Sequence, residues 1–368
     1  MYLEQKQLQN DLKIFLALVA SLIIIGLLFI YSSSSVYALE KYSTAAYFVK
    51  KQCIGLMLGF IGLLACRLIP LDFIKNISSL FFCSSLALTA LTLLPRFSEK
   101  IHGSRRWLYC CGFSFQPSEL LKIALIVYIA YFLTKQEAHL RSFRYGYLPF
   151  VTILGSVALV LLKQPDFGMT MTILITSFLL FFIVQFKTKH LVLTMATLLP
   201  AVCALIYMRP YRWQRILTFL NPWNDPQGAG FQIIQSLIAI GSGSLFGIGI
   251  SHSKQKFFYL PMQHTDFIFS IIAEETGFIG SLALITIYML FLYFGIRIAW
   301  QLKDSFASLM TLGFVLLITL QTTINLAVAT GLAPTKGIGL PFVSYGISSL
   351  LCSMCMVGLI MNCVYENR

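Results

Sequence analysis

The chain has 368 residues, of which 58% are hydrophobic and only 11% are charged. A soluble domain carries roughly a quarter charged residues, so this composition excludes a water-soluble enzyme, a disordered chain, a disulfide scaffold and a nucleic-acid-binding module. The 27 Lys and Arg outnumber the 14 Asp and Glu. In a membrane protein such an excess either sets topology or attracts anionic lipid and phosphate groups.

Ten apolar runs follow along the chain, and about 20 apolar residues suffice to cross a membrane. They cover residues 14–31, 52–69, 77–94, 120–133, 148–162, 169–186, 191–208, 267–292, 309–329 and 342–361. The runs are continuous, whereas the strands of a transmembrane barrel alternate. The fourth and fifth runs are short, so we expect both helices to extend into flanking polar residues that face protein or water. The sequence predicts an all-α integral membrane protein, one domain over 1–368 with about ten transmembrane helices.

The first run has two interpretations. Lys6 and Lys13 precede it, and the string SVYA at 35–38 resembles the small-residue cleavage site of a signal peptide. A retained helix is favoured, because the run is long and further runs follow. The N-terminus is then cytoplasmic, since the short connections on its side are basic. The opposite side is also rich in Lys and Arg, which favours a bound anionic ligand there over scattered solvated charges.

One large extracytoplasmic loop is expected between spans 7 and 8, at about residues 209–266. Loops of this length inside a compact domain are usually functional. Residues 231–240 are amphipathic, with Gln235 among the polar positions, and predict a short helix at the membrane surface. The glycine-rich residues 241–249 predict a flexible turn after it.

Ionisable groups at the edges of apolar runs mark candidate sites, because they are costly within a membrane. Glu119 and Lys122 are three residues apart, so they share a helix face and can form an ion pair with a packing role, a substrate role or both. Asp166 directly precedes the sixth run, where it could be a helix N-cap or part of a site.

A basic and aromatic set forms the next candidate. It comprises Arg105, Arg106 and Trp107, and the segment 211–215 with Arg212 and Arg215. Arginine matches phosphate oxygens with two parallel hydrogen bonds. The alternative is an aromatic belt anchored by arginines at the membrane interface.

The densest acidic cluster surrounds the start of the eighth run. His264 and Asp266 end the long loop, and Glu274 and Glu275 follow within the run. Asp266 and Glu274 are eight positions apart, about 80° around a helix, so both could face one cavity. A desolvated carboxylate has a raised pKa and can accept a proton near neutral pH. Alternatively, Asp266 caps the helix and the glutamates pair with Lys or Arg.

The chain resembles the SEDS family (shape, elongation, division and sporulation) in several strings that occur in order over nearly its whole length. These are GSRRWL at 103–108, QPSELLK at 116–122, KQPDFGMT at 163–170, PYRWQRILTFLNPWNDPQGAGFQIIQSLIAIGSG at 210–243, YLPMQHTDFIFSIIAEETGFIG at 259–280 and TGLAPTKGIGLPFVSYG at 330–346. NPW at 221–223, QK at 255–256 and TKG at 335–337 are more similar to the cell-division branch than to the elongation branch.

The resemblance implies a peptidoglycan glycosyltransferase of the bacterial cytoplasmic membrane that polymerises lipid II on the extracytoplasmic side. It also implies a class B penicillin-binding protein and other divisome membrane proteins as partners, and no nucleic acid. It assigns the essential aspartate to Asp266 and gives importance to Glu119 and Lys122.

The expected reaction is an inverting displacement. It needs a base for the acceptor hydroxyl, assigned to Asp266, and positive charge at the leaving pyrophosphate, assigned to Arg106, Arg212 and Arg215, with Lys122 as a further candidate. The whole set of candidate substrate-binding residues is Arg106, Glu119, Lys122, Asp166, Arg212, Arg215, Gln235, His264, Glu274 and Lys336. A divalent cation, Mg or Mn, could share this work, but the sequence shows no dedicated metal site.

The chain departs from the family pattern at Met262, at Ile347 and at residues 326–327. Met262 replaces a glutamate, which removes a negative charge from the site. We expect the other two departures to alter helix packing without touching the chemistry. A lipid II flippase and a non-catalytic scaffold for the transpeptidase remain the alternative functions.

Overall fold

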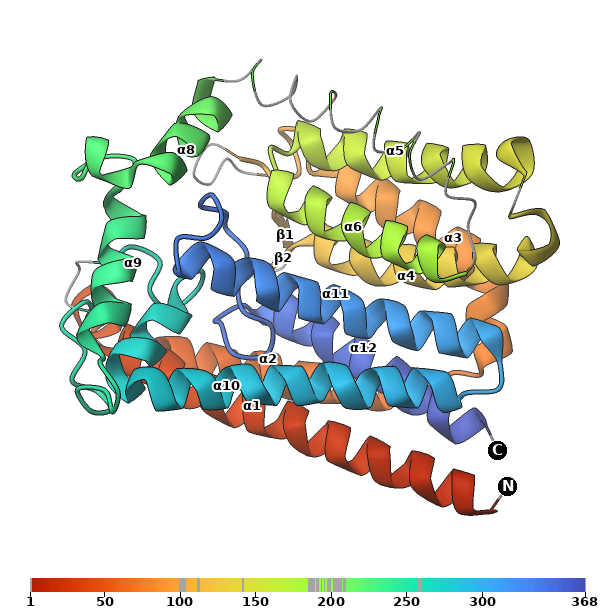
Figure 1. Cartoon of the computed structure of the whole chain (residues 1–368), viewed down its shortest axis with the longest axis horizontal. Coiled ribbons are helices and arrows are strands. Elements are labelled where there is room, and N and C mark those ends of the chain that lie inside the picture. The colour runs from red at the N-terminus through yellow and green to blue at the C-terminus, as the bar shows by residue number, and fades with distance from the viewer. Residues whose placement is uncertain are drawn as a thin grey trace.

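The computed structural model describes residues 2–98, 104–110, 113–140, 142–184, 210–256 and 260–367, with isolated positions between 189 and 207. Figure 1 shows long helices running side by side along the longest axis, with both chain ends at one end of the bundle and α8 and α9 at the other.

The long helices reproduce the predicted crossings. They are α1 (Tyr2–Tyr42), α2 (Tyr47–Leu68), α3 (Leu71–Leu91), α4 (Pro117–Lys135), α5 (Leu148–Lys163), α6 (Phe167–Ile183), α10 (Ile268–Gln301), α11 (Ser305–Ala329) and α12 (Ile347–Glu366). Within the described ranges, eight helical segments are long and apolar enough to span a membrane, and α6 is a shorter apolar helix. The prediction of an all-α membrane protein is confirmed, and the predicted seventh crossing, 191–208, lies largely outside the described residues.

The two short runs lengthen as expected. α4 starts at Pro117, before Glu119 and Lys122, and α5 continues back through the turn Phe143–Tyr147 into a 21-residue span. The first run also lengthens, because α1 continues through residues 35–38 to Tyr42. There Ser32 donates hydrogen bonds to the Glu275 carboxylate of α10.

The α2–α12 pair packs most closely, through small residues. A Cβ atom added to Gly59 would lie 3.0 Å from the Met354 side chain, and one added to Gly358 would collide with the Leu63 carbonyl oxygen. Such close approach lets helices associate by direct packing in lipid, where no hydrophobic force drives them together.

The long loop carries α8 (Pro210–Leu220), a short 3₁₀ turn (Pro222–Asn224) and α9 (Phe231–Ser242). α9 is the predicted surface helix, and Figure 1 shows it lying across the ends of the long helices. Its apolar face is buried, and Ser236 donates to the Ala329 carbonyl of α11.

The glycine-rich segment after α9 forms the predicted turn, and its backbone is hydrogen-bonded to α10. α10 breaks at Gly277, whose φ is 68° and ψ is −162°. The amides of Ile248 and Gly249 donate to the carbonyls of Glu274 and Glu275, and Phe278 donates back to Ser244. A broken helix in a membrane must have its freed backbone groups satisfied, and the glycine-rich chain supplies those partners.

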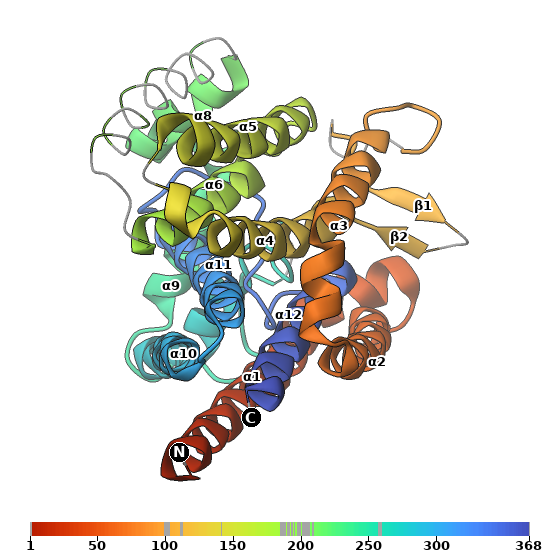
Figure 2. The ribbon, with the colours of Figure 1, turned by 90° about the vertical axis from the view of Figure 1, so that its right-hand side faces the viewer.

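A two-stranded antiparallel hairpin was not predicted. β1 (Leu108–Cys110) pairs with β2 (Phe113–Phe115), and Figure 2 shows it projecting beside α3. Strands of three residues are too short to show an alternating pattern.

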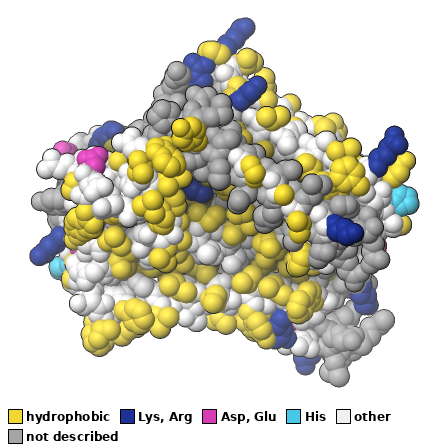
Figure 3. Space-filling view, turned by 45° about the horizontal axis from the view of Figure 1, so that its top comes forward, with side chains coloured by type: hydrophobic (Ala, Val, Ile, Leu, Met, Phe, Trp, Pro, Cys, Tyr) yellow, Lys and Arg dark blue, Asp and Glu magenta, His cyan; other side chains and the backbone are white. Residues whose placement is uncertain are grey.

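The surface of the molecule is that of a membrane protein. In Figure 3 hydrophobic side chains cover much of the face, and Lys and Arg lie mainly toward its margins.

Candidate active site

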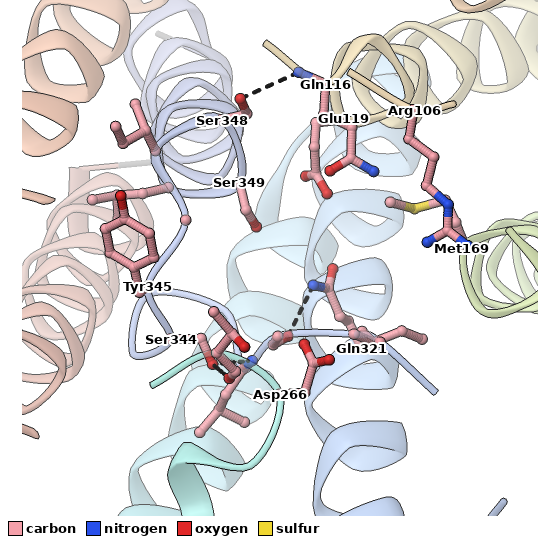
Figure 4. A pocket seen from close by; sticks show the side chains of 18 of the residues that line it. Arg106, Gln116, Glu119, Met169, Asp266, Gln321, Ser344, Tyr345, Ser348 and Ser349 are labelled. Atoms are coloured by element: carbon pink, nitrogen blue, oxygen red, sulfur yellow. Dashed lines mark hydrogen bonds between the residues drawn. The ribbon is translucent and has the colours of Figure 1, made fainter. Parts of the chain in front are cut away.

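A cavity of about 350 Å³ opens among the first turns of α4, α6 and α12, the segment before α10 and the chain between α11 and α12. Four of the predicted residues line it, namely Arg106, Glu119, Asp166 and Asp266. They come from parts of the sequence up to 160 positions apart, and the fold brings them to one space. Figure 4 labels Arg106, Glu119 and Asp266 among the residues that line it.

Asp266 lies just before the first residue of α10, Ile268. Its backbone carbonyl accepts a hydrogen bond of 2.8 Å from Asn325 Nδ2, which also donates to the Ile338 carbonyl at 2.7 Å. No described residue donates a hydrogen bond to its carboxylate, which projects into the cavity beside Gln321 (Figure 4). On the other side, a Cβ atom at Gly337 would lie 3.3 Å from Asp266 Oδ2.

The environment of this carboxylate suits a general base. Burial raises the pKa of Asp266 to about 6, opposed by the positive charges of Arg106 and Arg215 and assisted by the negative charge of Asp166. A base with a pKa near the working pH is largely deprotonated yet still accepts a proton in the transition state.

Arg106 and Asp166 are held together beside it. Arg106 Nη1 lies 3.4 Å from Asp166 Oδ2, and Nη2 donates to the Pro165 carbonyl at 2.7 Å. The Asp166 carboxylate also accepts from the Met169 amide at 3.2 Å, so it is the N-cap of α6 as predicted. Burial raises the pKa of Asp166, and the Arg106 charge opposes that rise.

Glu119 and Lys122 form the predicted ion pair, with 2.7 Å between Oε2 and Nζ. Lys122 is only 1% exposed and does not line the cavity. Its ammonium donates to Gln321 Oε1 at 3.1 Å, and Gln321 Nε2 donates to the Gly339 carbonyl at 3.1 Å. Lys122 therefore supports the wall of the cavity, and its predicted contact with pyrophosphate does not fit this geometry.

A smaller cavity of about 170 Å³ adjoins the first, and we call it the cationic pocket. Three predicted basic residues line it, Arg106, Arg215 and Lys336, and it shares Asp166 and Gly337 with the larger cavity. Burial and the neighbouring Arg215 charge lower the pKa of Lys336. The side chain of Arg212, the remaining predicted arginine, lies outside the described residues.

His264 does not line these two cavities. Its ring packs 4.5 Å from the Phe48 ring and 5.8 Å from the Tyr345 ring, centroid to centroid. Burial lowers the pKa of His264 to about 4, so it is uncharged at neutral pH. Its backbone carbonyl accepts from the Tyr345 amide, which ties the segment before α10 to the one before α12.

Glu274 lies apart from Asp266, so the prediction that both face one cavity is wrong. Asp266 precedes the helix, so helical spacing does not relate the two. The Glu274 carboxylate instead accepts from Ser253 Oγ and from the Lys254 amide at 3.0 Å. Glu275 lies 3.7 Å from Lys256 Nζ, as the alternative interpretation of the glutamates proposed.

Gln235 is half-buried on α9 and is absent from the residues lining either cavity. Ile347, by contrast, lines the main cavity and packs against Gly55. The expected helix contact of Ile347 is therefore confirmed, and the side chain also forms part of the cavity wall. Met262 also lines the cavity, with a φ of 56°.

Sequence reasoning missed Gln321 and Asn325, which lie one turn apart on α11 and fix the walls around Asp266. Polar side chains within an apolar run were the signal that could have found them. The described residues contain no cluster of three or more His, Cys, Asp or Glu that could hold a metal.

A family model and several known proteins match this chain over almost its whole length. The family model FTSW_RODA_SPOVE, described as a cell cycle protein, matches residues 12–368. A probable peptidoglycan glycosyltransferase FtsW of Geobacter sp. (strain M18) is 41% identical over 337 residues, 92% of each chain. Stage V sporulation protein E of Bacillus subtilis (strain 168) is 39% identical over 341 residues, 93% of each chain.

Solved structures share the fold. A chain from the structure described as "Structural coordination of polymerization and crosslinking by a peptidoglycan synthase complex" superposes with a TM-score of 0.80 at 29% identity, covering 96% of this chain and 97% of that one. The rod shape determining protein RodA of Thermus thermophilus gives a TM-score of 0.71 at 25% identity, covering 96% of each chain.

Proposed function

Since the chain belongs to the FtsW/RodA/SpoVE family of cell cycle proteins, we propose that it is a peptidoglycan glycosyltransferase that polymerises lipid II during cell division. It is a multi-pass bacterial membrane protein. The cell-division assignment rests on the FtsW relatives, which agree with the motifs of the division branch.

One observation carries the proposal. The buried Asp266 carboxylate, which accepts no hydrogen bond from a described residue, lies beside the cationic pocket and its three basic side chains. A hydroxyl of the acceptor sugar attacks the anomeric carbon of the donor. Asp266 accepts the hydroxyl proton, the bond from that carbon to the diphosphate oxygen breaks, and the electron pair leaves with the diphosphate. A single displacement of this kind inverts the anomeric configuration.

The cationic pocket stabilises the leaving group. Negative charge grows on the diphosphate as the bond breaks, and Arg106, Arg215 and Lys336 are placed to balance it. Asp166 holds Arg106 in position, so little reorganisation accompanies the reaction. Arg215 is likewise fixed, since Nη1 donates to the Thr335 carbonyl at 2.6 Å.

A divalent cation fits the same chemistry. Mg²⁺ and Mn²⁺ prefer carboxylate, water and phosphate oxygens, and the carboxylates of Asp166 and Asp266 line the same cavity. Asp166 would supply a ligand to the ion, with the diphosphate and water supplying the others, and the ion would add positive charge to the leaving group while Asp266 remains the base.

The site faces the extracytoplasmic side in this proposal. Both chain ends lie at the end of the bundle opposite α8 and α9 (Figure 1), and the short basic connections favour the cytoplasm for the chain ends. The partner is a class B penicillin-binding protein, which crosslinks the strands. Support for it comes from the likeness to a chain of a peptidoglycan synthase complex.

Purified protein in detergent, given lipid II with and without a co-purified class B penicillin-binding protein, tests the function. Polymer should form, because polymerisation does not need a bilayer. A flippase would yield no polymer in detergent, since transport has no meaning there. A scaffold would also yield none with a transpeptidase that lacks polymerase activity.

A further inference from the structure

The chain between α11 and α12 forms one wall of the main cavity, and we call residues 340–346 the serine turn. Leu340, Phe342, Ser344 and Gly346 of this turn line the cavity. Phe342 has a φ of 66°, in the left-handed region that bulky side chains rarely adopt. Such a conformation persists only where the surrounding structure holds it in place. The contacts that hold the serine turn therefore shape the cavity.

One of these contacts comes from α2, through the side chain of Gln52. Gln52 is 1% exposed and does not line the cavity. Its Nε2 donates to the Ser344 carbonyl at 3.3 Å, and its Oε1 accepts from the Gly346 amide at 3.1 Å. Both ends of the carboxamide are matched, because a carbonyl can only accept and a backbone amide can only donate. A single side chain thereby fixes two residues of the serine turn.

The serine turn also holds the segment before α10, which carries Asp266. The Ser344 hydroxyl donates to the Thr265 carbonyl at 2.5 Å. The Tyr345 amide donates to the His264 carbonyl at 2.9 Å. Since these two carbonyls belong to the residues directly before Asp266, the backbone on the amino-terminal side of the base is anchored to the turn.

Asp266 is therefore held from two directions, by α11 through Asn325 and by α2 through the serine turn. We propose that Gln52 is a positioning residue for the general base, which fixes the serine turn and so keeps the Asp266 carboxylate directed at the acceptor hydroxyl. This inference rests on the proposed glycosyltransferase function. Its expected effect is large, because a displacement of about 1 Å in a catalytic group can cost about 10²-fold in rate.

The test compares two buried amides that bond main-chain groups at opposite ends of α2. Gln52 lies near the start of α2, whereas Asn362 of α12 donates to the Cys66 and Ile69 carbonyls at its end. Both side chains belong to residues that are 1% exposed. Gln52→Met and Asn362→Leu keep the approximate size of each side chain and remove its hydrogen bonds, so both should lower the melting temperature. Only Gln52→Met should alter the site.

The measurement is the initial rate of lipid II polymerisation by the full-length protein in detergent, co-purified with a class B penicillin-binding protein. We expect Gln52→Met to lower kcat about tenfold or more while KM for lipid II changes less than about twofold, because positioning acts on the transition state. Asn362→Leu should keep the wild-type kcat. An unchanged kcat in Gln52→Met, or equal losses of kcat in the two variants, would overturn the inference.

Ser344→Ala provides a second variant that spares the contacts of Gln52, which are made with the main chain. It removes the hydroxyl that joins the serine turn to Thr265, so kcat should fall here as well. The two changes act along one path, so kcat of the double variant should lie within about twofold of the lower single variant. Losses that multiply would overturn the inference. Should Gln52→Met fail to fold, a wild-type kcat in Ser344→Ala would overturn it alone.

Failure of this inference is distinguishable from failure of the proposed function. A wild type that makes no polymer contradicts the glycosyltransferase assignment itself. A wild type that polymerises lipid II, with Gln52→Met and Ser344→Ala at the same kcat, contradicts the positioning role of Gln52 alone.

Discussion

The side-chain amide of Asn325 joins the backbone carbonyl of Asp266 to α11, with a donor–acceptor distance of 2.8 Å. The same nitrogen holds the Ile338 carbonyl, and Gln321, one turn earlier, holds that of Gly339. Two amides on one helix face thereby fix both chain segments that border the carboxylate. The base is positioned through its main chain, while its carboxylate remains available for a substrate proton.

Replacing Asn325 with Leu should therefore reduce polymerisation. Two buried carbonyls would lose their donor, at a cost of about 1–3 kcal/mol each, and Asp266 would lose its fixed position. We expect the turnover rate to fall at least tenfold, with a smaller change in KM for lipid II, because positioning affects the transition state more than binding. Thr323→Val, an exposed change on the same helix, is the control, and equal kinetics for the two variants would contradict this role.

The pH dependence of polymerisation follows from the pKa of Asp266. The base must be deprotonated, so a pKa of about 6 predicts rates that rise as pH increases through 6 and level off above it. The Arg106 charge lowers that pKa, so Arg106→Gln should move the midpoint of the remaining activity to higher pH. Initial rates between pH 5 and 8 measure both, and a midpoint that moves downward would oppose this electrostatic account.

Asp266→Asn should fold at least as stably as the wild type at pH 7.5. The folded-state pKa lies above the value of 3.8 for an unperturbed aspartate, so the folded state binds the proton more tightly than the unfolded state. Ionisation then costs stability as pH rises from about 4 through 6. The asparagine variant avoids this cost, so its melting temperature at pH 7.5 should equal or exceed that of the wild type, while a lower value would show a structural role.

The Glu119–Lys122 pair should separate stability from activity. Lys122→Met leaves a buried carboxylate unpaired, and such a loss costs about 3–5 kcal/mol. Glu119→Leu combined with Lys122→Met should restore much of the stability, as apolar replacements of buried pairs often do. Polymerisation should stay low in the double variant, because Gln321 has lost the ammonium that orients it. Full activity in the double variant would show that the pair serves stability alone.

The contact between the glycine-rich segment and the break in α10 can be tested by substitution. Gly277 has a φ of 68°, and an added Cβ would collide with the Gly247 amide nitrogen. Gly277→Ala should therefore displace the glycine-rich segment and lower both melting temperature and polymerisation. Gly241→Ala is the matched control, because nothing lies within 4 Å of its added Cβ. Similar effects of the two changes would mean that the close approach of Gly277 to Gly247 contributes nothing to stability or polymerisation.

The length and continuity of apolar runs sufficed to predict the described long helices, because a membrane crossing needs little beyond an apolar segment. Local rules also predicted the Glu119–Lys122 pair and the Asp166 cap, since both depend on spacing of three residues. The break at Gly277 was missed because it depends on a chain segment about thirty residues earlier. The misplacement of Glu274 has a similar cause, since helical spacing is informative only once the first helical residue is known.

The site was predictable where residues lie at the ends of apolar runs, as Asp166 and Asp266 do. Gln321 and Asn325 were missed because a polar residue within an apolar run does not reveal its partner. Lys122 and His264 were given substrate roles on charge and position, but burial and packing place them behind the cavity wall. Which side of a helix faces a cavity depends on tertiary contacts that a single sequence does not contain.

The most direct test compares wild type with Asp266→Asn for lipid II polymerisation in detergent, each co-purified with the same class B penicillin-binding protein. Removal of the general base should lower the rate by roughly 10²–10⁴-fold. The variant complex should elute at the same volume as the wild-type complex, which shows that folding and partner binding are unchanged. Polymer formed at the wild-type rate by the folded asparagine variant would contradict the account.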